Sequence, residues 1–194
     1  MISDKHKFIF IEVPKTGTTT ICFTLSKEFQ AKYPLGNTRH VNKHWDVEQY
    51  KETYPVKFKS YFKFSFVRNP WSRVVSLYQR NEGKQWKDKI SFIEFVDWIQ
   101  LATDTCTMPT PKKNMLDFFK IDNKVEMDFI GKLENIQEDF DTVCDKIGLP
   151  RKQLGHENFS GHKHYTKYYN DKTKKIIGEK FAEDIEYFGY EFEG

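Results

Sequence analysis

Short apolar runs alternate along the chain with segments of helical spacing. The run from Phe8 to Val13 is rich in β-forming residues, which is typical of a buried strand, and Pro14 ends it. Phe62 to Val67 is a second strand candidate, and Glu126 to Gly131 is a third. A helical pattern follows each of them. This order of strand and helix predicts an α/β fold with a mainly parallel sheet.

Five segments have apolar residues three or four positions apart and are therefore predicted as helices. They span about 18–29, 70–80, 91–99, 136–147 and 171–188. Asn69 suits the N-cap of the second helix, with Pro70 at its first position. Ser91 and Glu94 form a capping box at the start of the third, and Gly148 ends the fourth.

Composition narrows the classes of function. The 194 residues are 38% apolar and 30% charged, as in an ordinary globular protein, and we expect a single domain over residues 1–194. Lys and Arg exceed Asp and Glu by only 31 to 28, too small a surplus for a nucleic-acid-binding domain. The separated cysteines Cys22, Cys106 and Cys144 predict reduced thiols in a cytoplasmic protein. The apolar runs are too short for a membrane span.

The strongest local signal is the segment from Lys15 to Thr20, between the first strand and the first helix. Ligands of α/β proteins bind at the carboxyl ends of strands, where a helix N-terminus offers backbone N–H groups to an anion. Lys15 adds a cation, Gly17 permits close backbone approach, and the hydroxyls of Thr18, Thr19 and Thr20 are donors. The segment therefore predicts a phosphate-binding loop. The alternative is a strand–helix turn with threonine caps.

This segment differs from the Walker A loop of nucleotide-dependent kinases. In that motif the Lys follows the last Gly, and a Ser or Thr comes next to hold magnesium. Here Lys15 precedes Gly17, and no acidic residue obviously closes a metal site. The order of residues disfavours a small-molecule kinase, which we keep as an alternative.

A second strand–helix junction repeats the arrangement. Arg68 follows the strand predicted at 62–67, and its planar guanidinium suits a phosphate group. Ser76 lies about two turns into the next helix. An arginine-capped helix start without a ligand is the alternative interpretation. Two such junctions in a small domain indicate a ligand with phosphate groups at two places.

At these residues the sequence resembles the sulfotransferases. The segment Pro-Lys-Thr-Gly-Thr-Thr at 14–19 is similar to their 5′-phosphosulfate loop. Arg-Asn-Pro-Trp at 68–71, with Ser76, is similar to their 3′-phosphate segment. The resemblance continues through 129–135 and 168–190, so it covers nearly the whole chain in order, and it is strongest to the carbohydrate-type branch, sulfotransferase family 2. It implies a P-loop-like three-layer fold with a central sheet flanked by helices.

The resemblance implies 3′-phosphoadenosine 5′-phosphosulfate as donor and adenosine 3′,5′-bisphosphate as product. Arg68 and Ser76 would bind the 3′-phosphate, and Lys163, in a late basic-aromatic cluster, would contact the nucleotide. The 5′ end would be held by Lys15, Thr16, Gly17, Thr18, Thr19 and Thr20. In the implied in-line displacement at sulfur, Lys15 stabilises charge on the bridging oxygen. No metal is expected, because a sulfuryl group carries less charge than a phosphoryl group.

The acceptor hydroxyl needs a general base, and the candidates precede Arg68. His44 matches the family best; His40, Asp46 and Glu48 are alternatives. The stretches 33–61 and 103–125 show no clear period, and we expect them to form the acceptor pocket. The resemblance implies an acceptor on a saccharide or glycolipid, while tyrosine and small metabolites stay open. A nucleotide-binding module without catalysis is a further alternative.

Overall fold

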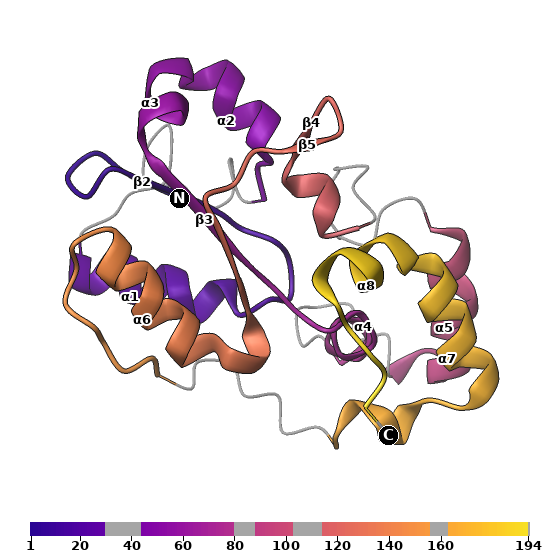
Figure 1. Ribbon diagram of the computed structural model, residues 1–194. Coiled ribbons are helices and arrows are strands. Elements are labelled where there is room, and N and C mark those ends of the chain that lie inside the picture. The colour runs from indigo at the N-terminus through magenta and orange to yellow at the C-terminus, as the bar shows by residue number, and fades with distance from the viewer. Residues whose placement is uncertain (30–43, 80–87, 103–113, 156–162, 194) are drawn as a thin grey trace. The chain divides into compact units, whose positions relative to one another are not determined.

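The computed structural model of the protein describes residues 1–29, 44–79, 88–102, 114–155 and 163–193 (Figure 1). The chain divides into two compact units. Unit 1 consists of Met1–Val67 and Leu116–Asn158, and unit 2 of Arg68–Met115 and Phe159–Gly194. Each unit is described by itself below. The expectation of a single functional domain over 1–194 stays a prediction.

Unit 1 contains a four-stranded sheet that is mainly parallel, as predicted. Its strands, in sheet order, are β1 (Ile2–Ser3), β2 (Phe8–Ile11), β3 (Phe62–Val67) and β6 (Phe129–Lys132). β2, β3 and β6 run parallel, and β1 pairs with β2 in the antiparallel direction. In register, Ile11 is opposite Ser65 and Val67 is opposite Lys132. The carboxyl ends of the three parallel strands therefore lie at one edge of the sheet.

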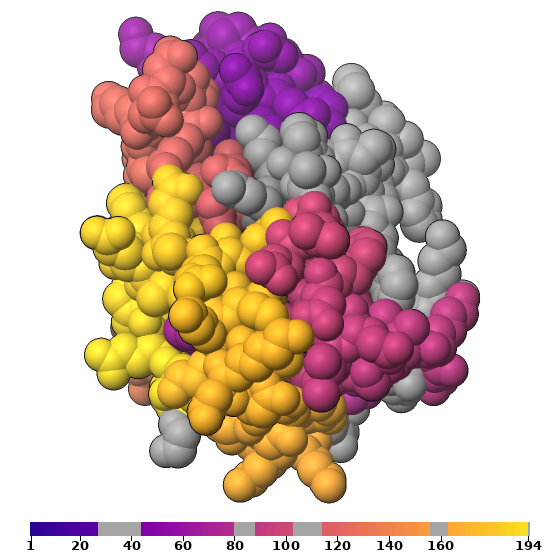
Figure 2. Space-filling model, turned by 90° about the vertical axis from the view of Figure 1, so that its right-hand side faces the viewer, coloured from indigo at the N-terminus to yellow at the C-terminus, as the bar shows by residue number. Residues whose placement is uncertain are grey.

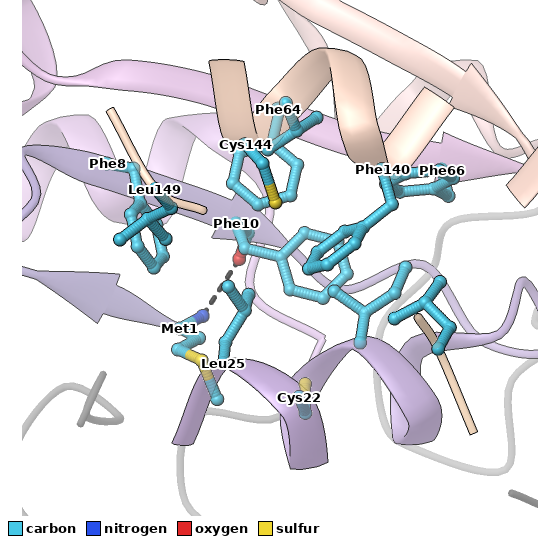
Figure 3. Packing of buried hydrophobic residues seen from close by; sticks show 13 residues of the cluster. Met1, Phe8, Phe10, Cys22, Leu25, Phe64, Phe66, Phe140, Cys144 and Leu149 are labelled. Carbon is cyan, nitrogen blue, oxygen red and sulfur yellow. Dashed lines mark hydrogen bonds between the residues drawn. The ribbon is translucent and has the colours of Figure 1, made fainter. Parts of the chain in front are cut away.

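Phenylalanine rings from β2 and β3 form the core on one face of this sheet (Figure 3). Phe10 is opposite Phe64 in the register, and their rings stack with centroids 5.0 Å apart. The Met1 amino nitrogen donates a hydrogen bond to the Phe10 carbonyl oxygen at 2.8 Å. The helices α1 (Thr18–Phe29) and α6 (Ile136–Lys146) cover this core and contribute Ile21, Cys22, Leu25, Phe140, Val143 and Cys144.

The opposite face of β3 carries polar side chains that are also buried. The Lys63 ammonium lies 2.8 Å from the Asp128 carboxylate and 5.3 Å from the centroid of the Phe58 ring in helix α3 (Pro55–Ser60). The Ser65 hydroxyl donates to the Ile11 carbonyl oxygen at 2.7 Å. Helices thus contribute to both sides of the sheet, which agrees with the predicted three-layer fold.

Two short helices occupy a stretch for which we predicted no regular structure. They are α2 (Val47–Thr53) and α3 (Pro55–Ser60). The Asp46 carboxylate accepts from the Gln49 N–H at 2.9 Å, and the Gln49 side chain accepts from the Asp46 N–H, which completes a capping box. The prediction was wrong here because helices of six and seven residues are too short to display a helical period.

The third strand begins later than the sequence pattern predicted. It was predicted from Glu126 to Gly131, whereas β6 spans Phe129–Lys132, and before it comes a hairpin of β4 (Lys120–Ile121) and β5 (Lys124–Val125). The Asp128 carboxylate then accepts from the backbone N–H of Lys63 at 2.7 Å, so strand pairing along β6 starts only at Phe129. Two short 3₁₀ turns, η2 (Leu116–Phe118) and η3 (Leu133–Asn135), complete the described elements of unit 1.

Unit 2 is helical and has a core rich in aromatic residues. Its described elements are α4 (Pro70–Tyr78), α5 (Phe92–Leu101), the 3₁₀ turn η4 (Tyr165–Tyr168), α7 (Asp171–Lys180) and α8 (Ala182–Phe188). α5 and α7 pack side by side, which Figure 2 shows as the pink and orange surfaces. The capping box of Ser91 and Glu94 at the start of α5 confirms the sequence prediction.

The last predicted helix is interrupted at Phe181. Phe181 is the C-cap of α7 and has a non-helical backbone, and its ring is buried with the Arg73 guanidinium 6.0 Å from the ring centroid. The apolar spacing predicted a continuous helix because Ile177, Phe181 and Ile185 all face the same core on either side of the break. Among the described helices of both units, none is long and apolar enough to cross a membrane.

Candidate functional site

The predicted phosphate-binding loop connects β2 to α1 in unit 1. Its backbone enters the left-handed region twice, at Lys15 with φ of 68° and at Gly17 with φ of 80°. Left-handed backbone is uncommon for a residue other than glycine, and such strain is concentrated at functional sites. The Thr16 hydroxyl is buried and donates to the Val13 carbonyl oxygen at 2.9 Å. The Thr16 hydroxyl therefore joins the two ends of the turn from Val13 to Thr16. Because its hydroxyl proton is used in this bond, Thr16 would donate to a ligand through its backbone N–H.

The two strand–helix junctions begin their helices differently. Asn69 caps α4, because its side-chain oxygen accepts from the N–H groups of Trp71 and Ser72 at 3.1 and 3.3 Å. α1 instead follows Gly17, which has no side chain with which to accept a hydrogen bond from the first turn. A helix start that is not capped by its own N-cap side chain suits an anion better than a capped one.

Gly17 is also a point of close packing within unit 1. A Cβ atom at this position would come within 2.7 Å of Leu133 Cδ1 and 3.0 Å of Ile136 Cδ1. The loop thus lies against the start of α6, which follows β6. Because β2, β3 and β6 end at the same edge of the sheet, the loop occupies the edge at which α/β proteins bind ligands.

His44 is bonded to the segment between β2 and this loop. Its Nδ1 atom is 2.7 Å from the backbone carbonyl oxygen of Glu12, three residues before Lys15. A carbonyl oxygen only accepts, so Nδ1 carries the proton of this hydrogen bond. The lone pair of the neutral ring is then on Nε2. His44 is 94% buried and has a left-handed backbone with φ of 69°.

The alternative bases occupy different environments. Asp46 is buried, and its Oδ1 atom is used to cap α2. Glu48 is exposed in the first turn of α2. His40 lies outside the described residues. His44 is bonded to Glu12, which lies between β2 and the loop.

The second predicted cluster lies in unit 2, at the start of α4. Arg68 directly follows β3, and its Nε donates to the Ser72 hydroxyl oxygen at 2.9 Å. Ser72 and Ser76 are one helical turn apart and therefore share a face of α4. The Arg68 guanidinium thus lies along the face that carries Ser76. Sequence reasoning did not single out Ser72, although its spacing of four from both Arg68 and Ser76 is a signal that could have found it.

Lys163 is exposed and directly precedes His164 and the turn η4. η4 packs against α4 within unit 2. The Tyr168 hydroxyl accepts from the Gln79 amide at 3.0 Å, and the Tyr169 hydroxyl donates to the Trp71 carbonyl oxygen at 2.9 Å. These bonds attach the basic-aromatic segment that follows Lys163 to α4, the helix that contains Ser76. The contact of Lys163 with a nucleotide stays a prediction.

Comparison of the sequence with known protein families identifies the family of this chain. A family model described as "Sulfotransferase family" matches residues 1–191. The chain belongs to the sulfotransferase family. Within the described residues, no group of three or more His, Cys, Asp or Glu side chains is arranged to hold a metal ion.

Individual members of the sulfotransferase family match at low identity. Human carbohydrate sulfotransferase 9 is 26% identical over 219 residues, which cover 95% of this chain and 47% of the relative. Carbohydrate sulfotransferase 14 of Danio rerio is 24% identical over 232 residues, covering 98% of this chain and 61% of the relative. The chain thus spans less than two thirds of the length of either enzyme.

A third relative matches over a shorter region. An uncharacterized protein of Archaeoglobus fulgidus is 39% identical over 97 residues, which are 49% of this chain and 74% of that protein. No solved structure matches the chain.

Proposed function

We propose that the protein transfers the sulfuryl group of 3′-phosphoadenosine 5′-phosphosulfate to an acceptor hydroxyl. The observation that carries the proposal is the left-handed loop of Lys15 and Gly17 at the start of α1, with His44 bonded to the same strand end. Membership of the sulfotransferase family, an enzyme family, supports the reaction class. The order of Lys15 and Gly17 also differs from the Walker A order expected of a kinase.

In this proposal the donor is bound at both of its phosphate positions. The backbone N–H groups and side chains of 15–20 bind the 5′-phosphosulfate, and Arg68 and Ser76 bind the 3′-phosphate. Lys163 contacts the nucleotide. When sulfur–oxygen cleavage leaves negative charge on the bridging oxygen, the Lys15 ammonium and the positive end of α1 stabilise it. The leaving group is adenosine 3′,5′-bisphosphate.

His44 is proposed as the general base. The hydrogen bond from Nδ1 to the Glu12 carbonyl favours the tautomer with its lone pair on Nε2. Nε2 then accepts the proton of the acceptor hydroxyl while the oxygen attacks sulfur in line with the departing phosphate. A histidine is suited to this role because its ordinary pKa lies near neutrality.

The acceptor is proposed to be a hydroxyl group of a saccharide or glycolipid. Two of the relatives are named carbohydrate sulfotransferases, at 26% and 24% identity. A screen of saccharides, glycolipids, tyrosine peptides and small phenols with the ³⁵S-labelled donor tests the class directly. Label transfer to the peptides or phenols alone would contradict the carbohydrate assignment.

Thermal shift and turnover separate the proposed function from its alternatives. Adenosine 3′,5′-bisphosphate at about 100 times its Kd should stabilise the protein by roughly 2.7 kcal/mol. ATP with magnesium should stabilise it less, whereas the reverse order would support a kinase.

His44→Ala should lower kcat by about 10²–10⁴-fold with unchanged nucleotide affinity. Glu48→Ala, an exposed neighbour, is the control, and an inactive Glu48→Ala beside an active His44→Ala would reassign the base.

A further inference from the structure

α4 is a nine-residue helix in which seven residues are buried. The other two are Ser72 and Ser76, which are both partly exposed and lie one turn apart. Apart from Arg73, the buried residues of the helix are apolar or aromatic, and burial gives no reason for two serines on one face. The Arg68 Nε atom donates to the first of them at 2.9 Å.

We propose that Ser72 is a positioning residue that selects how Arg68 binds the 3′-phosphate of the donor. This inference rests on the proposed function, in which Arg68 and Ser76 bind that phosphate. It adds a residue that acts through Arg68 and gives the protein its preference for nucleotides with a 3′-phosphate.

The reasoning begins with the shape of the guanidinium. An arginine can grip an oxyanion bidentately either side-on, through Nε and one Nη, or end-on, through its two Nη groups. In this protein Nε already donates to Ser72, so the side-on edge is engaged within the protein. Ser72 thereby fixes the direction in which the Arg68 head group points.

Because α4 is capped by Asn69, anion binding at its start depends on the orientation of the Arg68 guanidinium. Asn69 accepts from the N–H groups of Trp71 and Ser72, and its carbonyl oxygen accepts from the Arg73 N–H at 2.8 Å. The first-turn donors of α4 are therefore used by Asn69. An anion at this junction must be held by side chains, and its affinity depends on how well the Arg68 guanidinium is aimed.

The first test compares two nucleotides that differ only in the 3′-phosphate. In calorimetric titrations, Ser72→Ala should weaken the binding of adenosine 3′,5′-bisphosphate by about 3- to 10-fold, the size of one hydrogen bond. Binding of adenosine 5′-phosphate should not change. Ser72→Thr keeps the hydroxyl and should restore tight binding of the bisphosphate. A purely structural role of Ser72 would weaken both nucleotides or neither.

A double-mutant cycle tests whether Ser72 acts through Arg68. Adding Ser72→Ala to Arg68→Ala should cause no further loss of affinity for the bisphosphate, because the orienting bond no longer has a donor. Equal losses from Ser72→Ala in both backgrounds would overturn the inference. So would wild-type affinity for the bisphosphate in Ser72→Ala, with the proposed function left standing. If the wild-type protein does not bind the bisphosphate, the proposed function fails, and the inference fails with it.

Discussion

Replacing Gly17 by alanine tests the geometry of the phosphate-binding loop. Gly17 has a left-handed backbone with φ of 80°. Its missing Cβ atom would lie 2.7 Å from Leu133 Cδ1 and 3.0 Å from Ile136 Cδ1. Gly148, which follows α6 in the same unit, is a matched control. It has φ of 67° and nothing within 4 Å of the corresponding Cβ position.

The expected losses of stability follow from these contacts. Left-handed backbone costs an alanine about 1–2 kcal/mol, and the lower entropy of its unfolded chain offsets about 0.4–1 kcal/mol of this. Gly148→Ala should therefore lower the free energy of unfolding by about 1 kcal/mol. Gly17→Ala adds the close contact with two flexible side-chain ends, which costs about 1 kcal/mol more, at the low end for overpacking. We expect a total near 2 kcal/mol for Gly17→Ala.

Urea unfolding of the two variants and the wild type measures these differences. A double-mutant cycle with Leu133→Ala should recover about 1 kcal/mol in the Gly17→Ala background, because it removes the nearest colliding atom. Gly17→Ala should also weaken the binding of adenosine 3′,5′-bisphosphate, since the loop must shift to accept the methyl group. Gly148→Ala should leave this binding unchanged.

Two results would refute the reasoning. If Gly17→Ala costs no more than Gly148→Ala, the loop does not pack against Leu133 and Ile136 as described. If Gly17→Ala destabilises the protein but binds the nucleotide with wild-type affinity, the loop is only a structural turn. The latter outcome would also remove the observation on which the proposed function rests.

Three further predictions concern other parts of the molecule. Burial, followed by the nearby carboxylates of Asp141 and Asp145, raises the pKa of the Cys144 thiol to about 11. Iodoacetamide at about pH 8 should therefore label Cys144 in urea but not in the native protein, and native labelling at the unfolded rate would contradict this. Asn69→Ala should cost about 2 kcal/mol in urea unfolding, because Asn69 caps α4 and also donates to the Glu191 carbonyl oxygen. The control Asn170→Ala removes a cap whose oxygen accepts only from groups of Thr173, in the same turn, and should cost about 1 kcal/mol. Equal costs would refute the role of the bond from Asn69 to Glu191. Sulfuryl transfer should keep its rate in excess EDTA, and a loss reversed by magnesium would revive the kinase alternative.

The sequence alone predicted the elements with strong local signals. The strand Phe62–Val67 and the helix Thr18–Phe29 have the predicted bounds. Asn69 and the pair of Ser91 and Glu94 cap helices as predicted, because a capping side chain bonds to backbone only two or three residues away. The parallel sheet could be predicted from the order of strands and helices, since parallel neighbours need a crossover between them.

Short or interrupted elements were decided by tertiary packing. α2 and α3 are too short to show a period, although Asp46 and Gln49 carried a capping signal. The last predicted helix is interrupted at Phe181, whose ring is buried in the core of unit 2. The spacing of apolar positions is the same on both sides of the break, so the pattern could not reveal it.

In the candidate site too, features built from adjacent residues could be predicted, whereas contacts between distant residues could not. Loop residues 15–20 and the pair of Arg68 and Ser76 were identified from adjacent residues, because a strand, a turn and a helix start are contiguous in sequence. The hydrogen bond of His44 to Glu12 joins residues 32 positions apart, and no local pattern encodes it. The hydrogen bond from the Arg68 Nε to the Ser72 hydroxyl depends on side-chain rotamers, which the pattern of residues does not encode. The sequence therefore determined which chemical groups are present at the strand ends, while the folded structure decided which nitrogen of His44 carries the proton and which edge of Arg68 is engaged.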